Sequence, residues 1–387
     1  KAAALGGART LIMKQTAHWG GRAPVDGGLI DGKPAQEFID ATLAELSAME
    51  NVVIKNRMMG AGVYDHGYLL GYERVTDHAP TATGPRHRLW RIRAGQIITA
   101  TGAIERPLSF AGNDIPGVML ASALRDYVVN YGVSVGDRTV VVTNNDDAYR
   151  TALVLKQAGL EVPVILDARI GGGGALADQA RAAGIRVENG KAIAKVKGGK
   201  RVKSVCICAQ AGEGSVLEEI ACDAVAMSGG WSPVVHLWSH CGGKLTWDDA
   251  DAMFRPDASR APLGKSGEAF VVTAGSASGY FGLDDILSDA SKAGSQAAAQ
   301  MGGTADAVPA PAADARDEAP LEPVWMMPQG ANIKLRMKAW LDYQNDVKVS
   351  DVQLAAQEGY ESVEHTKRYT TLGMATDQGK LSNINGL

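Results

Sequence analysis

The chain has 387 residues, of which 45% are hydrophobic and 21% charged, and its formal net charge is −4. This composition is ordinary for a globular protein, and the length suffices for two domains and a tail. The slight acidity and the lack of a basic run argue against nucleic acid or a membrane surface as the main partner. No apolar run reaches the about 18 residues that a membrane-spanning helix needs. With only four cysteines, we expect a protein of a reducing compartment, the cytoplasm.

The first residues are typical of the second half of a nucleotide-binding βαβ unit. Ala2–Leu5 predicts the end of a helix, and Arg9–Lys14 predicts a strand. The preceding strand and its glycine-rich turn would lie before Lys1, so we expect the sequence to begin inside a larger protein.

The end of this second strand is where such sites usually place an Asp or Glu that binds the adenosine ribose. Here Gln15 follows the strand. Its amide oxygen can accept a hydrogen bond, but it carries no charge to repel a 2′-phosphate. Gly20, Gly21 and Arg22 come next, and we count them with Gln15 as candidate cofactor-binding residues.

The next predicted elements are a helix over 34–49, a strand over 52–55, a hairpin over 60–75 and a strand over 88–93. Gln96–Pro107 then combines an apolar β-branched run with Ala-Thr-Gly and Glu-Arg-Pro. An ordinary buried strand with a turn would also explain it. In flavoproteins with two dinucleotide-binding domains, however, a similar strand ends beside the nucleotide. We therefore expect Thr101, Gly102 and Arg106 to lie beside a dinucleotide.

A complete βαβ half follows a helix predicted over 122–131. It consists of a strand at Arg138–Val142, a helix at Ala148–Gly159 and a strand at Val162–Leu166 that ends at Asp167. Its turn, Thr143–Ala148, lacks the expected glycines and carries two carboxylates where a pyrophosphate would bind. We interpret Asp146 or Asp147 as the helix N-cap and expect no dinucleotide here, although Asp167 keeps the position that binds ribose.

A last strand, Ala269–Ala274, leads into a glycine-rich turn and a helix over 283–301. Gly275 and Ser276 in this turn are candidates for holding a phosphate or a flavin-like ring. The Ala-, Pro- and Asp-rich stretch 302–323 predicts a linker. The remaining tail, Asn332–Leu387, is predicted to be mostly helical.

Metal binding is not expected. Cys206 and Cys208 lie on one face of a predicted strand, and His236 and His240 have helical spacing next to Cys241, but neither group has the further ligands that a metal site needs. We also find no arrangement of side chains that indicates a hydrolase.

The predicted fold class is therefore α/β, with two Rossmann-like dinucleotide-binding domains, the second inserted in the first, and a small, mostly helical C-terminal segment. The predicted boundaries are 1–120 with 250–301 for the first domain, 121–249 for the inserted domain, 302–323 for the linker and 324–387 for the C-terminal segment.

Taken together, the motifs resemble those of the α subunits of heterotetrameric sarcosine oxidases, over essentially the whole chain. The segments that carry the resemblance are Thr101–Pro107, Asn113–Val118, Thr143–Asp146 with Ala148–Ala152, Ser228–Pro233 and, most distinctively, His365–Lys380. Opine oxidase and cyanide synthase subunits share the first of these. They tend to have a cysteine-bearing iron–sulfur segment in place of the tail, and 332–387 contains no cysteine.

The resemblance implies the oxidative demethylation of sarcosine to glycine. The one-carbon unit leaves as formaldehyde or passes to tetrahydrofolate, and the electrons pass through flavin to oxygen, giving hydrogen peroxide. In that family the β subunit holds substrate and FAD, FMN lies at the α/β boundary, the α subunit binds NAD, and small γ and δ subunits complete the assembly. By analogy, NAD would contact Gln15, Gly20–Gly21, Thr101–Gly102 and Gly275–Ser276.

The same analogy suggests Lys367, Arg368 and Lys380 for the wall of the FMN site or for the partner contact. No residue of this chain is assigned as catalytic, so we do not expect the chain alone to catalyse the reaction. Two alternatives stay open: a self-sufficient FAD-dependent NAD(P)H or opine-type oxidoreductase subunit, and a non-catalytic structural subunit with an empty nucleotide cleft.

Overall fold

A computed structural model describes residues 1–304, 308–315 and 318–387. The chain forms two compact units, each made of separate stretches of sequence. Unit 1 comprises Lys1–Ala103, Pro233–Asp248 and Phe254–Arg316, and unit 2 comprises Ile104–Ser232, Asp249–Met253 and Asp317–Leu387. Most of unit 2 is therefore inserted within the sequence of unit 1. Among the described residues, none of the helices combines the length and the apolar character required to cross a bilayer.

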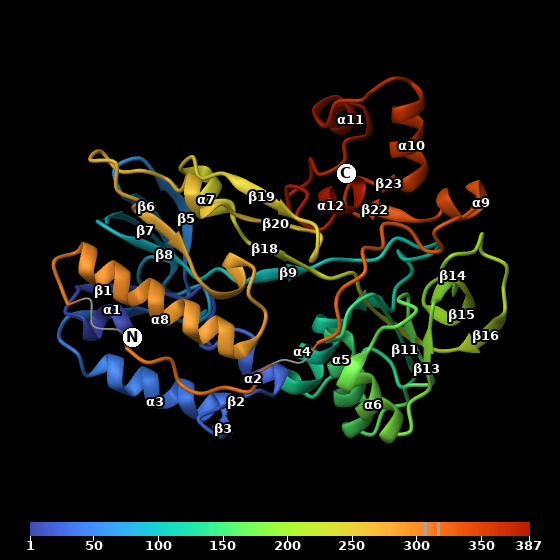
Figure 1. The fold of residues 1–387 in the computed structure, drawn as a ribbon, viewed down its shortest axis with the longest axis horizontal. Helices are drawn as coiled ribbons and strands as arrows, with labels where there is room; N and C mark the ends of the chain where they lie inside the picture. The colour runs from blue at the N-terminus through green and yellow to red at the C-terminus, as the bar shows by residue number, and fades with distance from the viewer. Residues whose placement is uncertain (305–307, 316–317) are drawn as a thin grey trace. The chain divides into compact units, whose positions relative to one another are not determined.

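Unit 1 is built on two pairs of parallel strands and an antiparallel meander (Figure 1). Its first stretch contains α1 (Ala2–Leu5), β1 (Thr10–Met13), α2 (Ala23–Asp26), β2 (Leu29–Ile30), β3 (Lys33–Pro34), α3 (Ala35–Ser47), β4 (Val52–Lys55), β5 (Met58–Tyr64), β6 (Tyr68–Arg74), β7 (His87–Arg93) and β8 (Ile97–Thr99). Its later stretches contain α7 (His236–His240), β19 (Leu245–Asp248), β21 (Val271–Thr273) and α8 (Leu283–Gln300). β1 pairs with β4 and β8 pairs with β21, while β5, β6 and β7 form the meander.

The core of unit 1 joins these parts through apolar side chains. Val63 and Leu69 of the meander cluster with Ile97 of β8 and Val271 of β21. A second cluster places Ile39 of α3 with residues of α8. The alternating apolar residues of the meander thus bury one face against the parallel pair β8–β21.

Unit 2 contains a five-stranded parallel sheet in the order β10-β17-β11-β12-β13. Its elements are β10 (Val118–Leu120), α4 (Ala121–Tyr131), β11 (Thr139–Thr143), α5 (Asp147–Gln157), β12 (Ile165–Asp167), α6 (Gly174–Ala182), β13 (Val187–Asn189), β14 (Lys191–Gly198), β15 (Val202–Ala209), β16 (Glu218–Ala221) and β17 (Ala224–Ser228). Figure 1 shows α4, α5 and α6 on one side of this sheet and the antiparallel β14–β16 on the other.

Both faces of the parallel sheet are buried, which explains the continuous apolar run of β11. Val141 points into the cluster with the helices, whereas Val140 and Val142 point into the cluster with β14 and β15. The period-two alternation of a strand thus supplies two separate cores.

The C-terminal part of unit 2 is a small mixed subdomain. It contains α9 (Ile333–Arg336), β22 (Trp340–Asp342), β23 (Val347–Lys348), α10 (Val349–Gln357), α11 (Val363–Thr370) and α12 (Asn383–Gly386). Ala339, Leu341, Val347, Val349 and Leu372 form its core. The predicted helices are present, but a two-stranded ribbon precedes most of them.

The chain passes between the compact units at Ala103/Ile104 and Ser232/Pro233, and again at Asp248/Asp249 and Met253/Phe254. The first two changes fall within short strands, β9 (Ala103–Glu105) and β18 (Trp231–Pro233), which pair with each other. The boundaries expected at 120 and 249 stay predictions.

The stretch predicted as a linker is held by specific contacts where the structure describes it. Asp31 N donates to Ala312 O over 2.7 Å in unit 1, and Asn144 Nδ2 donates to Glu322 O over 2.8 Å in unit 2. Backbone carbonyls in the stretch thus accept hydrogen bonds from each unit, and its role as a linker stays a prediction. Residues 305–307 and 316–317 of the predicted linker lie outside the described residues.

Candidate functional site

Two of the predicted nucleotide-binding segments leave the same edge of unit 1. β8 and β21 run parallel with Thr99 opposite Thr273, and Ala274 N donates to Thr99 O over 3.1 Å. The carboxyl ends of both strands therefore lie side by side. Thr101–Gly102 and Gly275–Ser276 follow directly from these ends, the position at which open α/β sheets bind ligands.

The Thr101–Gly102 turn is fixed by backbone contacts of unit 1. Thr101 Oγ1 donates to Val234 O over 2.6 Å, and Val234 N donates to Gly102 O over 2.9 Å. Gly102 has φ of 75°, which favours glycine, and no atom lies within 4 Å of the position where a Cβ would stand. The turn is thus rigid, and its glycine presents open backbone rather than a packed surface.

The Gly275 turn differs from the expected phosphate cradle. Gly275 N donates to Asp289 Oδ2 of α8 over 2.8 Å, so this amide is already satisfied within the chain. Residues Gly275–Ser278 form a 3₁₀ turn, and α8 begins only at Leu283. The Gly275 amide is therefore not free to hold a phosphate in this structure, whereas Ser276 is half-buried at the same edge.

Gln15 stands just beyond β1, whose partner is β4, so it follows a different strand pair from Thr101 and Gly275. Arg74 Nη2 donates to Gln15 O over 2.8 Å, which fixes its backbone. The residue itself is exposed. Its amide is therefore accessible to a ligand, as a ribose-binding group must be.

The three residues grouped with Gln15 have separate local roles. Gly20 has φ of 89°, a conformation that favours glycine, and it packs close to the Ile39 side chain of α3. Gly21 has φ of 60° and open space around it. Arg22 forms an ion pair with Asp26 over 3.1 Å, so its charge is at least partly neutralised by the chain.

Arg106 does not belong to the unit 1 edge. It lies in unit 2 and is 1% exposed. Its guanidinium donates to Gly229 O over 3.2 Å, to Asp251 O over 3.3 Å and to Ala252 O. Burial lowers the pKa of Arg106 to about 10. The guanidinium of Arg106 is thus bound to backbone carbonyls of unit 2, an arrangement that suits a structural role. A place for Arg106 beside a dinucleotide stays a prediction.

The turn that lacks glycines, after β11, is closed by a buried ionic cluster. Arg169 Nη2 lies 2.5 Å from Asp146 Oδ1 and 2.7 Å from Asp167 Oδ2. Tyr149 OH also donates to Asp167 Oδ2, over 2.8 Å. All four residues are buried. Asp167, the ribose-binding position of the sequence pattern, is thus saturated by side chains of its own unit.

The described residues 318–325, which we call the strap, cover this cluster from the carboxyl side of β11. Arg169 Nη1 donates to Ala319 O and Pro320 O over 3.3 and 3.0 Å, and Asp146 Oδ2 accepts from Ala319 N over 2.8 Å. Glu318 adds an ion pair of 2.7 Å with Arg150. The strap therefore fills the position that the pyrophosphate would take in a working βαβ site.

The electrostatics of the cluster keep the Arg169 guanidinium charged and the Tyr149 hydroxyl neutral. Burial by itself would lower the pKa of Arg169, but hydrogen bonds and charge attraction from Asp167 and Asp146 outweigh burial and raise it. Burial and the neighbouring Asp167 likewise raise the pKa of Tyr149, which keeps that hydroxyl a proton donor. Arg169 and Tyr149 are therefore the donors of the cluster, and the carboxylates of Asp146 and Asp167 are the acceptors.

The structure places Asp146 at the predicted N-cap position of α5 but without the capping role expected of it. It forms no side-chain capping bond, because Arg169 and the strap bind its carboxylate. Asp147 instead forms a 2.8 Å ion pair with Arg125. Asn145 Oδ1 accepts from Asp147 N over 3.1 Å and so supplies the polar contact at the helix start.

The three cations predicted for a flavin wall or a partner contact lie in the C-terminal subdomain of unit 2. Lys367 and Arg368 are carried by α11, and Lys380 follows in a loop. Arg368 and Lys380 are exposed and Lys367 is half-buried. The loop between them is anchored to β22, since Gly373 N donates to Asp342 Oδ2 over 2.9 Å.

Sequence comparisons relate the chain to one family. A family model described as "Sarcosine oxidase A3 domain" matches residues 336–387. The sarcosine oxidase subunit alpha of Rhizobium meliloti (strain 1021) is 38% identical over 385 residues, which cover 98% of this chain and 37% of that protein. The corresponding subunit of Corynebacterium sp. (strain P-1) is 39% identical over 393 residues, 98% of this chain and 39% of that protein. The chain thus spans little more than a third of these relatives.

Solved structures show the fold. An L-proline dehydrogenase from P. horikoshii matches with a TM-score of 0.69 and 19% identity, over 100% of this chain and 70% of that chain. Thioredoxin reductase from T. acidophilum matches with a TM-score of 0.53 and 16% identity, over 78% and 93%. The predicted fold class is confirmed: an α/β fold of the oxidoreductases with two nested dinucleotide-binding domains.

Loss of the Arg169 side chain should destabilise unit 2. Arg169→Met leaves Asp146 and Asp167 buried without their cation, and breaking such a pair costs roughly 3–5 kcal/mol. The matched control is Arg181→Met, because Arg181 forms an exposed pair with Asp178 and such pairs are worth about 0–1 kcal/mol. Urea unfolding measures both free energies, and equal losses in the two variants would contradict the role of the cluster.

Glu105 should make the stability of unit 2 depend on pH. It is 2% exposed and accepts a 2.8 Å hydrogen bond from Ser122 N. Burial and the nearby Asp147 raise its pKa from 4.5 to about 7. Between these values the folded chain keeps a proton that the unfolded chain releases, so the free energy of unfolding falls as pH rises, by up to about 3 kcal/mol.

The measurement is urea unfolding at pH 5 and pH 7 for wild type, Glu105→Gln and the exposed control Glu37→Gln. We expect the control to keep the wild-type pH dependence. Glu105→Gln should lose the part of the pH dependence that arises from titration of the Glu105 carboxyl. An unchanged slope in Glu105→Gln would show that this carboxyl does not titrate in that range.

Proposed function

We propose, on the premise that this chain is a homologue of the sarcosine oxidase α subunit, that it is the nucleotide-holding part of a multi-subunit oxidoreductase. The relatives are named as subunits, which implies a complex. In this proposal the complex oxidatively demethylates sarcosine to glycine and yields hydrogen peroxide with formaldehyde or methylene-tetrahydrofolate. The amine site and FAD belong to a β partner, and small γ and δ subunits complete the assembly.

The edge formed by β8 and β21 is the proposed site for NAD. Support comes from the parallel register that places Thr101–Gly102 beside Gly275–Ser276 and from the open backbone at Gly102. Gln15, with Gly21 near it in sequence, would meet the ribose. Bound NAD would supply a hydride acceptor, if it is redox-active, and the residues of this chain would bind and orient it.

The single observation that carries this choice of site is that the strap covers the turn after β11, where a second dinucleotide would bind. A self-sufficient FAD-dependent NAD(P)H oxidoreductase needs two dinucleotide sites. Here Arg169 and the strap occupy the second. Because these residues occupy the second site, we propose one nucleotide per chain, held in unit 1.

For FMN, we propose Lys367, Arg368 and Lys380. Cationic side chains can pair with a flavin phosphate, and two of the three are exposed on the subdomain that matches the A3 family model. The alternative role proposed for the same three residues is contact with a partner subunit.

The nucleotide content of the denatured, purified complex tests the function. We expect NAD at one per α chain by mass spectrometry. FAD at that ratio in the α chain without its partner would favour the self-sufficient oxidoreductase, and no nucleotide would favour a structural subunit.

Substitution of Gln15 should weaken NAD binding. Gln15→Ala removes a ribose hydrogen bond, which is worth about 1 kcal/mol or roughly fivefold in affinity. Gln36→Ala is the control, because Gln36 is also exposed in unit 1 and bonds only to Asp40 through its side chain in the described structure. Calorimetric titration of the nucleotide-free complex with NAD measures the affinity of each variant. Equal affinities would show that Gln15 does not contribute to NAD binding.

A further inference from the structure

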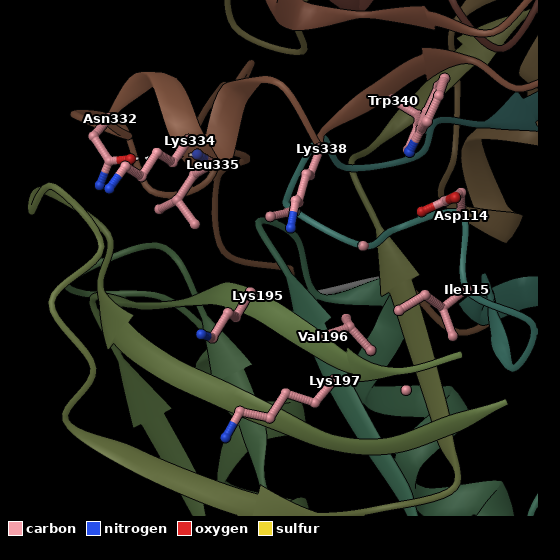
Figure 2. A pocket seen from close by; sticks show the side chains of 13 residues that line it. Asp114, Ile115, Lys195, Val196, Lys197, Asn332, Lys334, Leu335, Lys338 and Trp340 are labelled. Atoms are coloured by element: carbon pink, nitrogen blue, oxygen red, sulfur yellow. Dashed lines mark hydrogen bonds between the residues drawn. The ribbon is translucent and has the colours of Figure 1, made fainter. Parts of the chain in front are cut away.

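A cleft in unit 2 lies outside the residues proposed for NAD and FMN. Its volume is about 730 Å³. Figure 2 shows Lys195 and Lys197 on β14 at one wall, with Lys338 and Trp340 of the C-terminal subdomain at the other. The complete lining is Ala111, Gly112, Asp114, Ile115, Lys195, Val196, Lys197, Gly198, Asn332, Lys334, Leu335, Lys338 and Trp340.

The floor of the cleft is a backbone ladder that holds the two walls in register. Ala111 bridges to Lys195 on one side and to Ala339 on the other. Val196 N donates to Ala111 O and Gly112 N donates to Lys338 O, each over 2.8 Å. Both lysine-bearing walls are therefore fixed to the same short segment.

Charge in the cleft is strongly one-sided, with four lysines against Asp114. Lys197 forms an ion pair with Glu219 of β16 over 2.5 Å. Within the described part of the chain, no carboxylate pairs with the amines of Lys195, Lys334 or Lys338. Figure 2 shows Lys338 extending from its wall toward β14. Three cations thus line one hollow without an ion pair of their own, although Lys195 is also attracted to Glu219 and the chain as a whole carries a net charge of −4.

We propose that this cleft binds a small organic molecule with a diphosphate or triphosphate group. Lysine binds phosphate as a point charge, whereas carboxylates are commonly recognised by the two-pronged guanidinium of arginine, and no arginine lines the cleft. The phosphates would lie between Lys195 and Lys338. The organic remainder would rest on Ile115 and Trp340, which lie to the same side of the lysines.

The size of the cleft favours a small molecule over an acidic protein segment. Its volume falls within the range of about 300–1,000 Å³ typical of small-molecule sites. Figure 2 shows Ile115 and Trp340 to one side of the lysines, where they offer the cleft an apolar end.

The test is equilibrium dialysis of the intact protein with tripolyphosphate, at about 150 mM salt, where exposed charges are screened. Saturating NAD is present to occupy the proposed nucleotide edge. The variants are Lys195→Gln, Lys338→Gln and the double variant, with Lys334→Gln as an independent member of the same cleft. The control Lys156→Gln makes the same charge change on the exposed face of α5.

We expect wild type and the control to bind tripolyphosphate with equal affinity, and the double variant to bind about tenfold more weakly. Equal binding by all variants, or no saturable binding up to about 1 mM, would overturn the proposal. A glutamate-rich peptide of equal charge that bound more tightly than tripolyphosphate would also overturn it, in favour of an acidic protein segment. All of these outcomes are independent of whether NAD binds in unit 1.

Discussion

The Arg169 guanidinium stands between two buried carboxylates, and the organisation of unit 2 depends on this contact. Asp146 follows β11 and Asp167 ends β12, so two like charges meet at the carboxyl edge of the sheet. Without a cation they would repel each other in a region of low polarity. Arg169 neutralises both and, through Ala319 and Pro320, also holds the strap. One side chain thus joins the sheet to the chain segment that leads to the C-terminal subdomain.

Because of this contact, the two nested halves differ in their suitability for a dinucleotide. A dinucleotide site needs glycines at the first turn, exposed amides and a free ribose acceptor. In unit 2 the turn has side chains and the acceptor is saturated, whereas unit 1 has an open glycine at Gly102, after β8, and an exposed Gln15, after β1. The same architecture can therefore serve as a nucleotide holder in one half and as a support for further segments in the other.

The C-terminal subdomain has its own connection to the inserted half. Asn113 exchanges hydrogen bonds with the backbone of Trp340, and Gly112 bonds to Lys338. These contacts create the lysine-lined cleft as a consequence of joining β14 to the tail. Cations drawn from distant parts of the sequence meet only because this backbone ladder fixes their strands.

The sequence by itself determined the nested α/β fold and most helices and strands, because apolar periodicity and glycine turns are local signals. It also indicated that the Thr143–Ala148 turn is unsuited to a dinucleotide. Tertiary structure alone decided what fills that turn: Arg169 is two residues beyond Asp167, but its partners in the strap lie about 150 positions away. For the same reason, sequence could not show that Arg106 is bound by carbonyls near Ala252, that Gly275 is satisfied by Asp289, or that Lys195 faces Lys338. Contacts between residues so far apart in the chain have no local signature and arise only when the elements pack.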